Sequence, residues 1–174
     1  LMRFSEIVAS FPFYPTIITL SATIPPTASA YQRILLVMVL LGILSWTGIA
    51  RLVRGQILAE REKDYITAAR ALCLRENAIM SSHILPNILS IIIVQATLGY
   101  AGNLLSEAGL SFLGFGVPEP YPSWGNMMTS AQTSDVIQLY WWRWIFPGMA
   151  VFLTALTVNL IGDALRDALD PKSL

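Results

Sequence analysis

The stretch that decides the fold is ILLVMVLLGILSWTGI, residues 34–49, which contains no charged side chain. A half-buried strand alternates apolar and polar residues, whereas this segment is apolar all round, which is typical of a helix surrounded by lipid. Its ten or so aliphatic side chains each contribute roughly −0.3 to −0.6 kcal/mol at mid-membrane, and together they outweigh its few polar residues. Because hydrocarbon offers no partners to backbone groups, we predict an all-α integral membrane protein.

The composition of the 174 residues agrees with a lipid environment. Hydrophobic residues make up 55% and charged residues 13%, whereas a soluble domain carries about 25% charged residues. Eleven Lys and Arg residues balance eleven Asp and Glu residues, so the chain lacks a basic field that would hold nucleic acid. The single cysteine, Cys73, and the single histidine, His83, are too few for a structural zinc site. We therefore predict no nucleic-acid partner, no metal and no cofactor.

Three further uncharged runs are long enough to cross a membrane as helices of about 20 residues. They lie between Glu6 and Arg33, between His83 and Glu107, and between Arg143 and Asp163. The first contains several prolines, beginning with Pro12, that are expected to kink or end its helix, and we place its membrane part near residues 7–24. With residues 34–49, the sequence predicts about four transmembrane helices in one unit, residues 1–174.

The basic residues indicate which side each loop faces, because short cytoplasmic loops carry an excess of Lys and Arg. Six of them lie in the loop of residues 51–86: Arg51, Arg54, Arg61, Lys63, Arg70 and Arg75. With four crossings, three more basic residues share its side: Arg3, Arg166 and Lys172. Only Arg33 and Arg143 then lie outside, so we predict that both ends of the chain are cytoplasmic.

Polar side chains inside the predicted spans normally face the helix bundle or a wet path. Gln95, Asn103 and Asn159 are of this kind, and we regard them as candidates for lining such a path. The outer connection from Glu107 to Arg143 is long and apolar, and we predict that it packs on the mouth of the bundle. Its tryptophans suit a membrane-interface anchor better than a ligand cage: Trp141, Trp142 and Trp144.

A charged, helix-favouring stretch, DYITAARALCLRENAIMSSHILPN, occupies residues 64–87 of this apolar chain. It predicts two short helices, Asp64–Leu72 and Glu76–Leu85, that meet near Cys73, with Pro86 at the start of the next span. Isolated helices shorter than about 12–15 residues are marginal in water, so these two need a surface. That surface is either another protein or the lipid headgroups, and the residues alone leave both possibilities open.

The same stretch resembles the EAA loop of binding-protein-dependent ABC importer permeases. Thr67, Ala68 and Ala69 align with the opening triplet of that loop, Cys73 with its glycine, His83 with its isoleucine, and Leu85 and Pro86 with its Leu-Pro ending. Four further segments are similar to the oligopeptide and dipeptide permease subfamily, which also includes nickel permeases: RLVRGQ (51–56), LSFLGFG (110–116), PSWGNM (122–127) and VNLIGDALRDALDP (158–171). The resemblance covers nearly every residue.

The resemblance implies a type I transmembrane-domain bundle, here the last four of about six spans, in the cytoplasmic membrane of a prokaryote. Such a chain is a non-enzymatic permease subunit of an ATP-driven importer, and residues 51–86 form its coupling loop. The implied partners are a second permease subunit, separate ABC ATPase subunits, an extracytoplasmic substrate-binding protein and a substrate, which is a peptide or a nickel chelate. The implied ATPase-coupling residues are Tyr65, Thr67, Ala68, Ala69, Arg70, Leu72, Cys73, His83, Leu85 and Pro86.

Two residues depart from the family pattern. Cys73 stands where the family has a glycine, and a turn that needs a positive φ is strained by any side chain. Ser82 stands where subfamily members often have Arg or Lys. Both changes bear on how strongly the loop docks rather than on where it docks.

The chain offers no chemistry with which to hydrolyse ATP itself. Its only lysines, Lys63 and Lys172, do not follow a glycine, so no phosphate-cradling loop is present. No serine has glycines two residues before and after it, as a nucleophile elbow requires. The alternative to a transport function is a membrane scaffold, or an inactive truncated permease remnant, that binds partners without transporting anything.

Overall fold

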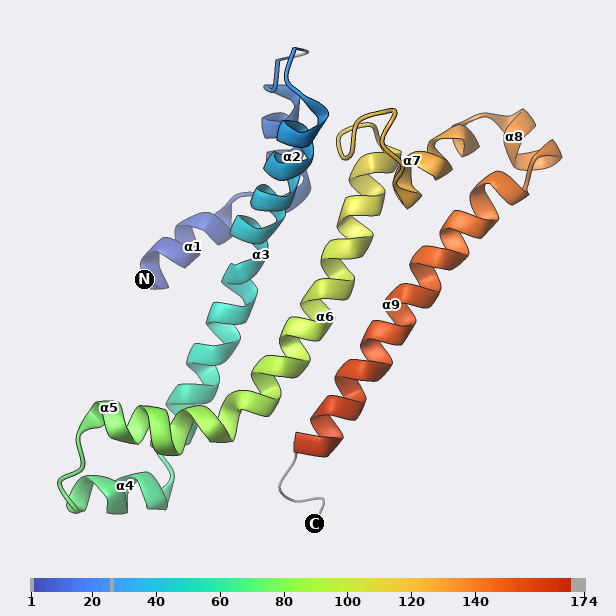
Figure 1. Ribbon diagram of the computed structural model, residues 1–174. Coiled ribbons are helices and arrows are strands. Elements are labelled where there is room, and N and C mark those ends of the chain that lie inside the picture. Colours follow the sequence, from blue (N-terminus) through green and yellow to red (C-terminus); the bar gives the residue numbers. More distant parts are fainter. Residues whose placement is uncertain (1, 26, 170–174) are drawn as a thin grey trace.

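Three long helices run side by side and form the body of the protein in this computed structural model, which describes residues 2–25 and 27–169. They are α3 (Ala30–Arg61), α6 (Leu85–Phe112) and α9 (Trp142–Leu169), and α6 lies between the other two (Figure 1). All regular elements in the described ranges are helical. The predicted all-α membrane fold is therefore confirmed.

The long helices expose most of their apolar side chains. In their most apolar windows only 11–17% of the residues are buried inside the protein. Side chains such as Met38, Phe152 and Leu160 are more than half exposed, which is unfavourable in water but suits a helix in contact with lipid or with another helix. Among the described residues, these three helices are long and apolar enough to cross a membrane.

The first predicted crossing, near residues 7–24, is broken at Pro12, as the prolines predicted, and is not a continuous helix of spanning length. The chain instead forms α1 (Met2–Ser10) and α2 (Phe13–Ala22), which both pack on α3. The break falls at Pro12, which precedes α2 in an extended conformation (φ −67°, ψ 124°) and has no N–H to continue a helix ladder. The described residues thus contain three helices of spanning length rather than about four.

Small and polar residues join the long helices. A Cβ added at Gly162 on α9 would lie 3.1 Å from the Thr97 Cγ2 atom on α6, so the two backbones approach closely there. Asn103 on α6 donates its side-chain amide to the Ser45 hydroxyl on α3, at 3.4 Å. Toward the C-terminal end of α6, an apolar cluster joins α2, α3 and α6 and contains Ile17, Val37, Leu41 and Leu110.

The connection between α6 and α9 folds over the ends of these helices. It contains α7 (Trp124–Thr129), a short 3-10 helix, η2 (Ser130–Gln132), and α8 (Ser134–Leu139). Gly125 of α7 touches α6 so closely that an added Cβ would lie 2.2 Å from the Ala108 carbonyl oxygen. The predicted packing of this connection on the bundle is therefore confirmed.

A buried hydroxyl organises this packing. Ser111 is buried, and its hydroxyl donates to the Glu107 carboxylate at 2.6 Å and accepts the Val117 backbone N–H at 2.9 Å. The Asn126 side-chain amide donates to the Val117 carbonyl at 2.7 Å. Glu107 therefore has a partner within the chain.

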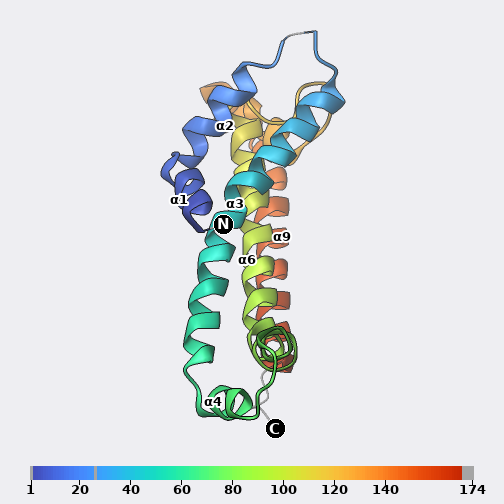
Figure 2. The ribbon, with the colours of Figure 1, turned by 90° about the vertical axis from the view of Figure 1, so that its left-hand side faces the viewer.

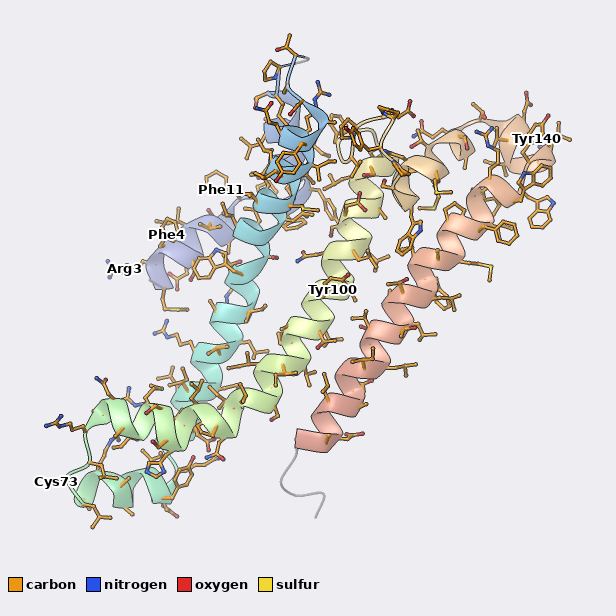
Figure 3. The ribbon with its side chains drawn as sticks, viewed as in Figure 1. Arg3, Phe4, Phe11, Cys73, Tyr100 and Tyr140 are labelled. Atoms are coloured by element: carbon orange, nitrogen blue, oxygen red, sulfur yellow. The ribbon has the colours of Figure 1, made fainter. Side chains whose placement is uncertain are left out.

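The two ends of the bundle differ in what they carry. The segment between α3 and α6 and the end of α9 lie at one end, and α7 and α8 lie at the other (Figures 1 and 2). This agrees with the sequence prediction that the 51–86 loop and the end of the last span share a side, whereas Arg3, which the same prediction placed there, lies on α1 away from that end (Figure 3). Lys172, one of the basic residues in that prediction, lies outside the described residues.

Candidate functional site

The segment between α3 and α6 folds into a hairpin that crosses the end of the bundle (Figure 1). It comprises α4 (Asp64–Ala71), α5 (Glu76–Ile79) and a π-helical turn, η1 (Met80–Ile84), and we call residues 64–84 the α4–α5 hairpin. The two short helices predicted from the sequence are present, and α4 begins and ends within one residue of the expected bounds. The second helix does not end at Leu85, because the chain continues through η1 into α6 without leaving helical geometry.

The hairpin has an apolar interior of its own. Five buried side chains pack together under α4, and Val53 and Ile57 of α3 pack against them: Ile66, Ala69, Ile79, Ile84 and Ile88. Because α4 has only eight residues, this packing rather than intrinsic helix propensity keeps it helical. The surface that the two short helices require is thus partly supplied by the chain itself.

The hairpin turns at Cys73, which lies at its tip (Figure 3). Cys73 has φ +57°, and its N–H donates to the Arg70 carbonyl at 2.9 Å while the Leu74 N–H donates to the Ala69 carbonyl at 3.3 Å. This pattern is a Schellman cap, in which glycine is the preferred residue at the left-handed position. The left-handed conformation costs a residue with a side chain roughly 1–2 kcal/mol, and Cys73 adopts this conformation.

A carboxylate clamps the two arms of the hairpin. Glu76, in the first turn of α5, accepts from Arg61 Nη2 at 3.2 Å and from Arg70 Nε at 3.1 Å. All three side chains are well exposed, so each ion pair contributes at most about 1 kcal/mol. Their main effect is to fix geometry, since they join the end of α3, α4 and α5 at a single group. Arg70 is therefore oriented toward its own hairpin.

A second polar group, which we call the Tyr65 junction, consists of Glu60, Tyr65 and Asn87. The Tyr65 hydroxyl on α4 donates to the Glu60 carboxylate at the end of α3 and accepts from the Asn87 side-chain amide on α6, at 2.9 Å. Lys63 Nζ lies 2.7 Å from Glu60 Oε2. Asn87 also donates to the His83 carbonyl at 2.7 Å. Three elements thus meet at one hydroxyl.

The environment keeps that hydroxyl protonated. Burial raises the pKa of Tyr65 above its ordinary value, and the hydrogen bond to Glu60 raises it further. The hydrogen bond to Glu60 likewise raises the pKa of Lys63, which therefore stays positively charged. At neutral pH the Tyr65 hydroxyl is consequently a neutral donor, and the Lys63 ammonium group beside the junction is charged.

The π-helical turn has an identifiable cause. Pro86 has no N–H for the Ser82 carbonyl, and its ring would clash with that carbonyl in a regular α-helix. The chain relieves this conflict with one wide turn, in which the Leu85 N–H donates to the Met80 carbonyl. Beyond the turn the chain bends away from the hairpin into α6 (Figure 1).

A cavity of about 610 Å³ lies beside the Tyr65 junction, between α3, α4, α6 and α9. Eight of its ten lining residues have polar side chains: Gln56, Glu60, Lys63, Tyr65, Asn87, Ser90, Ile91, Val94, Gln95 and Arg166 line it, and only Ile91 and Val94 are apolar. Of the three path candidates, Gln95 lines this cavity. Asn103 instead bonds Ser45 on the neighbouring helix, and the Asn159 side-chain oxygen is buried without a hydrogen-bond partner.

Most of the ten predicted coupling residues lie on the outer surface of the hairpin or at the start of α6. The exposed ones are Tyr65, Thr67, Ala68, Arg70, Leu72, Cys73, Leu85 and Pro86. His83 is half-buried and Ala69 is buried in the apolar interior, with 6% of its surface exposed. Ala69 therefore cannot lie against a partner as its exposed neighbour Ala68 can.

Three residues of the site were not singled out from the sequence: Glu60, Glu76 and Asn87. Glu60 and Glu76 sit among other charged residues, so nothing local marks them as partners of Tyr65 and of two arginines. Asn87 did carry a signal, because it is a polar residue directly after Pro86 at the start of an apolar span. Its partner lies 22 residues away along the chain, and that separation hid the connection.

The described part of the chain has three long apolar helices, and a folded hairpin connects two of them, α3 and α6. These features define a multi-span helical membrane protein. Residues 1–174 match the family described as the binding-protein-dependent transport system inner membrane component, and the chain belongs to this family. It is thus a membrane component of a transport system rather than a catalytic subunit. The resemblance to binding-protein-dependent permeases drawn from the sequence is confirmed.

Relatives in two bacteria illustrate the similarity. The chain is 40% identical over 172 residues to the oligopeptide transport system permease protein OppC of Haemophilus influenzae, covering 99% of this chain and 53% of the relative. It is 40% identical over 172 residues to the protein of the same name from Escherichia coli strain K12, covering 99% of this chain and 54% of the relative. The chain spans about half the length of these relatives.

Proposed function

We propose that this chain is part of a permease subunit of an ATP-driven importer of peptides, and that the α4–α5 hairpin docks on a separate cytoplasmic ATPase. Family membership supports a transport role, and the names of the relatives support peptides as the cargo. The remaining partners are a second permease subunit and an extracytoplasmic substrate-binding protein, on the side of α7 and α8. In this arrangement the α4–α5 hairpin and the end of α9 face the cytoplasm.

The observation that carries the docking proposal is the apolar tip of the hairpin. Leu72 is 76% exposed and Leu74 is 43% exposed, and Ala68 and Cys73 are exposed beside them. Exposed apolar residues on a folded, ion-paired element outside the spans mark an interaction surface. Ala68 leaves little bulk on the same surface, so a partner's backbone can approach closely.

Lipid headgroups are the competing surface for this tip. A membrane-surface helix presents a wide apolar face with basic residues beside it. In this hairpin, however, Arg61 and Arg70 bind Glu76, and the large apolar residues of α4 and α5 face inward. These features favour a protein partner.

The test is co-purification of the ATPase with the full-length subunit from membranes that contain all components of the importer. Leu72→Glu changes an exposed residue and leaves the apolar interior intact, so we expect the subunit to be produced normally while ATPase recovery falls by roughly tenfold or more. Leu139→Glu is the matched control, because Leu139 is 66% exposed on α8 at the other end of the bundle.

Peptide uptake into vesicles completes this test. We expect Leu72→Glu to abolish uptake together with ATPase binding. Normal ATPase recovery with Leu72→Glu would remove the docking proposal. An unmodified assembly that binds the ATPase but takes up no peptide would favour a scaffold over a permease.

A further inference from the structure

Three kinds of contact connect α4 to the rest of the chain, and they differ in what they fix. The apolar interior around Ile66 and Ala69 holds α4 in place, but apolar packing is not directional. The Arg70–Glu76 ion pair joins α4 to α5 within the hairpin. The Tyr65 hydroxyl, in contrast, connects α4 to both neighbouring long helices at once.

Tyr65 holds a special position among the α4 side chains. Within the described parts of the chain, it is the only one of them with a hydrogen bond to α6, through Asn87, and it bonds Glu60 on α3 as well. Hydrogen bonds tolerate only a narrow range of distance and angle. A shift or rotation of α4 therefore has to carry α3 and α6 with it or break a bond to a buried carboxylate.

The two helices that Tyr65 connects also line the polar cavity. Glu60 and Asn87 form part of its wall, and Gln95 continues that wall along α6. A displacement of α4 that moves the ends of α3 and α6 together changes the shape of this cavity. The junction is thus placed between the proposed docking surface and the space between the spans.

We infer that Tyr65 is a positioning residue whose hydroxyl ties α4 to α3 and α6 and thereby sets how efficiently movement of the docked hairpin reaches the spans. This inference rests on the proposed function. It assigns the Tyr65 hydroxyl to contacts inside the chain, with Glu60 and Asn87 as its partners, rather than to the ATPase surface.

The decisive measurement is the number of peptides taken up per ATP hydrolysed by the complete importer in proteoliposomes. Tyr65→Phe removes only the hydroxyl, and we expect this ratio to fall by roughly tenfold or more, as loss of a hydrogen bond to a charged group predicts. ATPase recovery on purification should stay unchanged. Tyr31→Phe is the matched control, because Tyr31 is 72% exposed at the start of α3, far from the hairpin.

Three further variants distinguish loss of the Tyr65 junction from a general loss of stability. Asn87→Leu removes the second partner at similar volume, and Tyr65→Phe combined with Asn87→Leu should lower the ratio no further than either change alone, because one unit is lost in each case. Glu60→Gln keeps an acceptor for the Tyr65 hydroxyl, so it should preserve most of the ratio.

The outcomes distinguish the role inferred for Tyr65 from the proposed function on which it rests. An unmodified assembly without ATPase binding or peptide uptake would refute the proposed function itself. If the unmodified assembly works and Tyr65→Phe takes up as many peptides per ATP as the unmodified assembly does, only the role of the hydroxyl is refuted. A proportional fall in hydrolysis and uptake also leaves the ratio unchanged and would show that Tyr65 has a merely structural role.

Discussion

At the scale of single residues, the chain builds the same cap twice with different residues. Gly114, with φ +83°, ends α6 through bonds from its own N–H to the Ser111 carbonyl and from the Phe115 N–H to the Leu110 carbonyl. Cys73 ends α4 with the same pair of bonds and with φ +57°. The strained version therefore lies in the hairpin, where the cap decides the direction in which α5 leaves.

We predict that Cys73→Gly raises the free energy of unfolding by about 0.5–1 kcal/mol. Glycine removes the left-handed penalty but brings a larger entropy loss on folding, so only part of the strain is recovered. Thermal denaturation of the full-length subunit in detergent measures the change. Gly114→Ala should show the opposite sign, and a loss of stability with Cys73→Gly would contradict the assignment of strain.

At the scale of elements, the close contact between α6 and α7 depends on a missing side chain. We predict that Gly125→Ala lowers the free energy of unfolding by roughly 1–3 kcal/mol, because its Cβ would overlap the Ala108 carbonyl oxygen and force α7 away from α6. Gly102→Ala is the control, since nothing lies within 4 Å of its added Cβ. Equal melting temperatures for the two variants would show that α7 is not packed this closely.

The two faces of α4 give a second prediction at this scale. Ala69→Glu places a charge in the apolar interior of the hairpin, so we expect it to unfold α4 and to lower the yield of folded subunit. Ala68→Glu points outward, and we expect a normal yield with impaired ATPase recovery. Limited proteolysis of the hairpin separates the two cases, and equal protease resistance would place both alanines on the same face.

At the scale of the whole molecule, the orientation of the bundle is open to a chemical test. Cys73 is exposed, is the only cysteine of the chain, and lies at the tip of the hairpin. We predict that a membrane-impermeant maleimide labels it only from the cytoplasmic side and that bound ATPase shields it. Variants with cysteine at Leu139 on α8 and serine at Cys73 should label only from outside, and the reverse pattern would invert the proposed topology.

Much of the architecture could be predicted because a helix that crosses lipid needs an apolar, uncharged run of about 20 residues. Uncharged runs of sufficient length predicted α3, α6 and α9, but not their ends, since α3 continues ten residues beyond Arg51 as a helix that is no longer purely apolar. Pro12 predicted a break in the first apolar run, but the sequence did not show that both resulting helices, α1 and α2, pack on α3. The Tyr65 junction could not be predicted, because Glu60, Tyr65 and Asn87 share no motif and meet only through the tertiary fold.

From Leu85 to Phe112, α6 is one uninterrupted α-helix of 28 residues, or roughly 42 Å. A single stiff lever of that length reaches from the hairpin to the Ser111 and Gly125 contact at the opposite end. A tilt of only a few degrees about its midpoint would shift both extremities by an ångström or more, in opposite directions. A movement at one end of the molecule therefore reaches the other end through α6 alone.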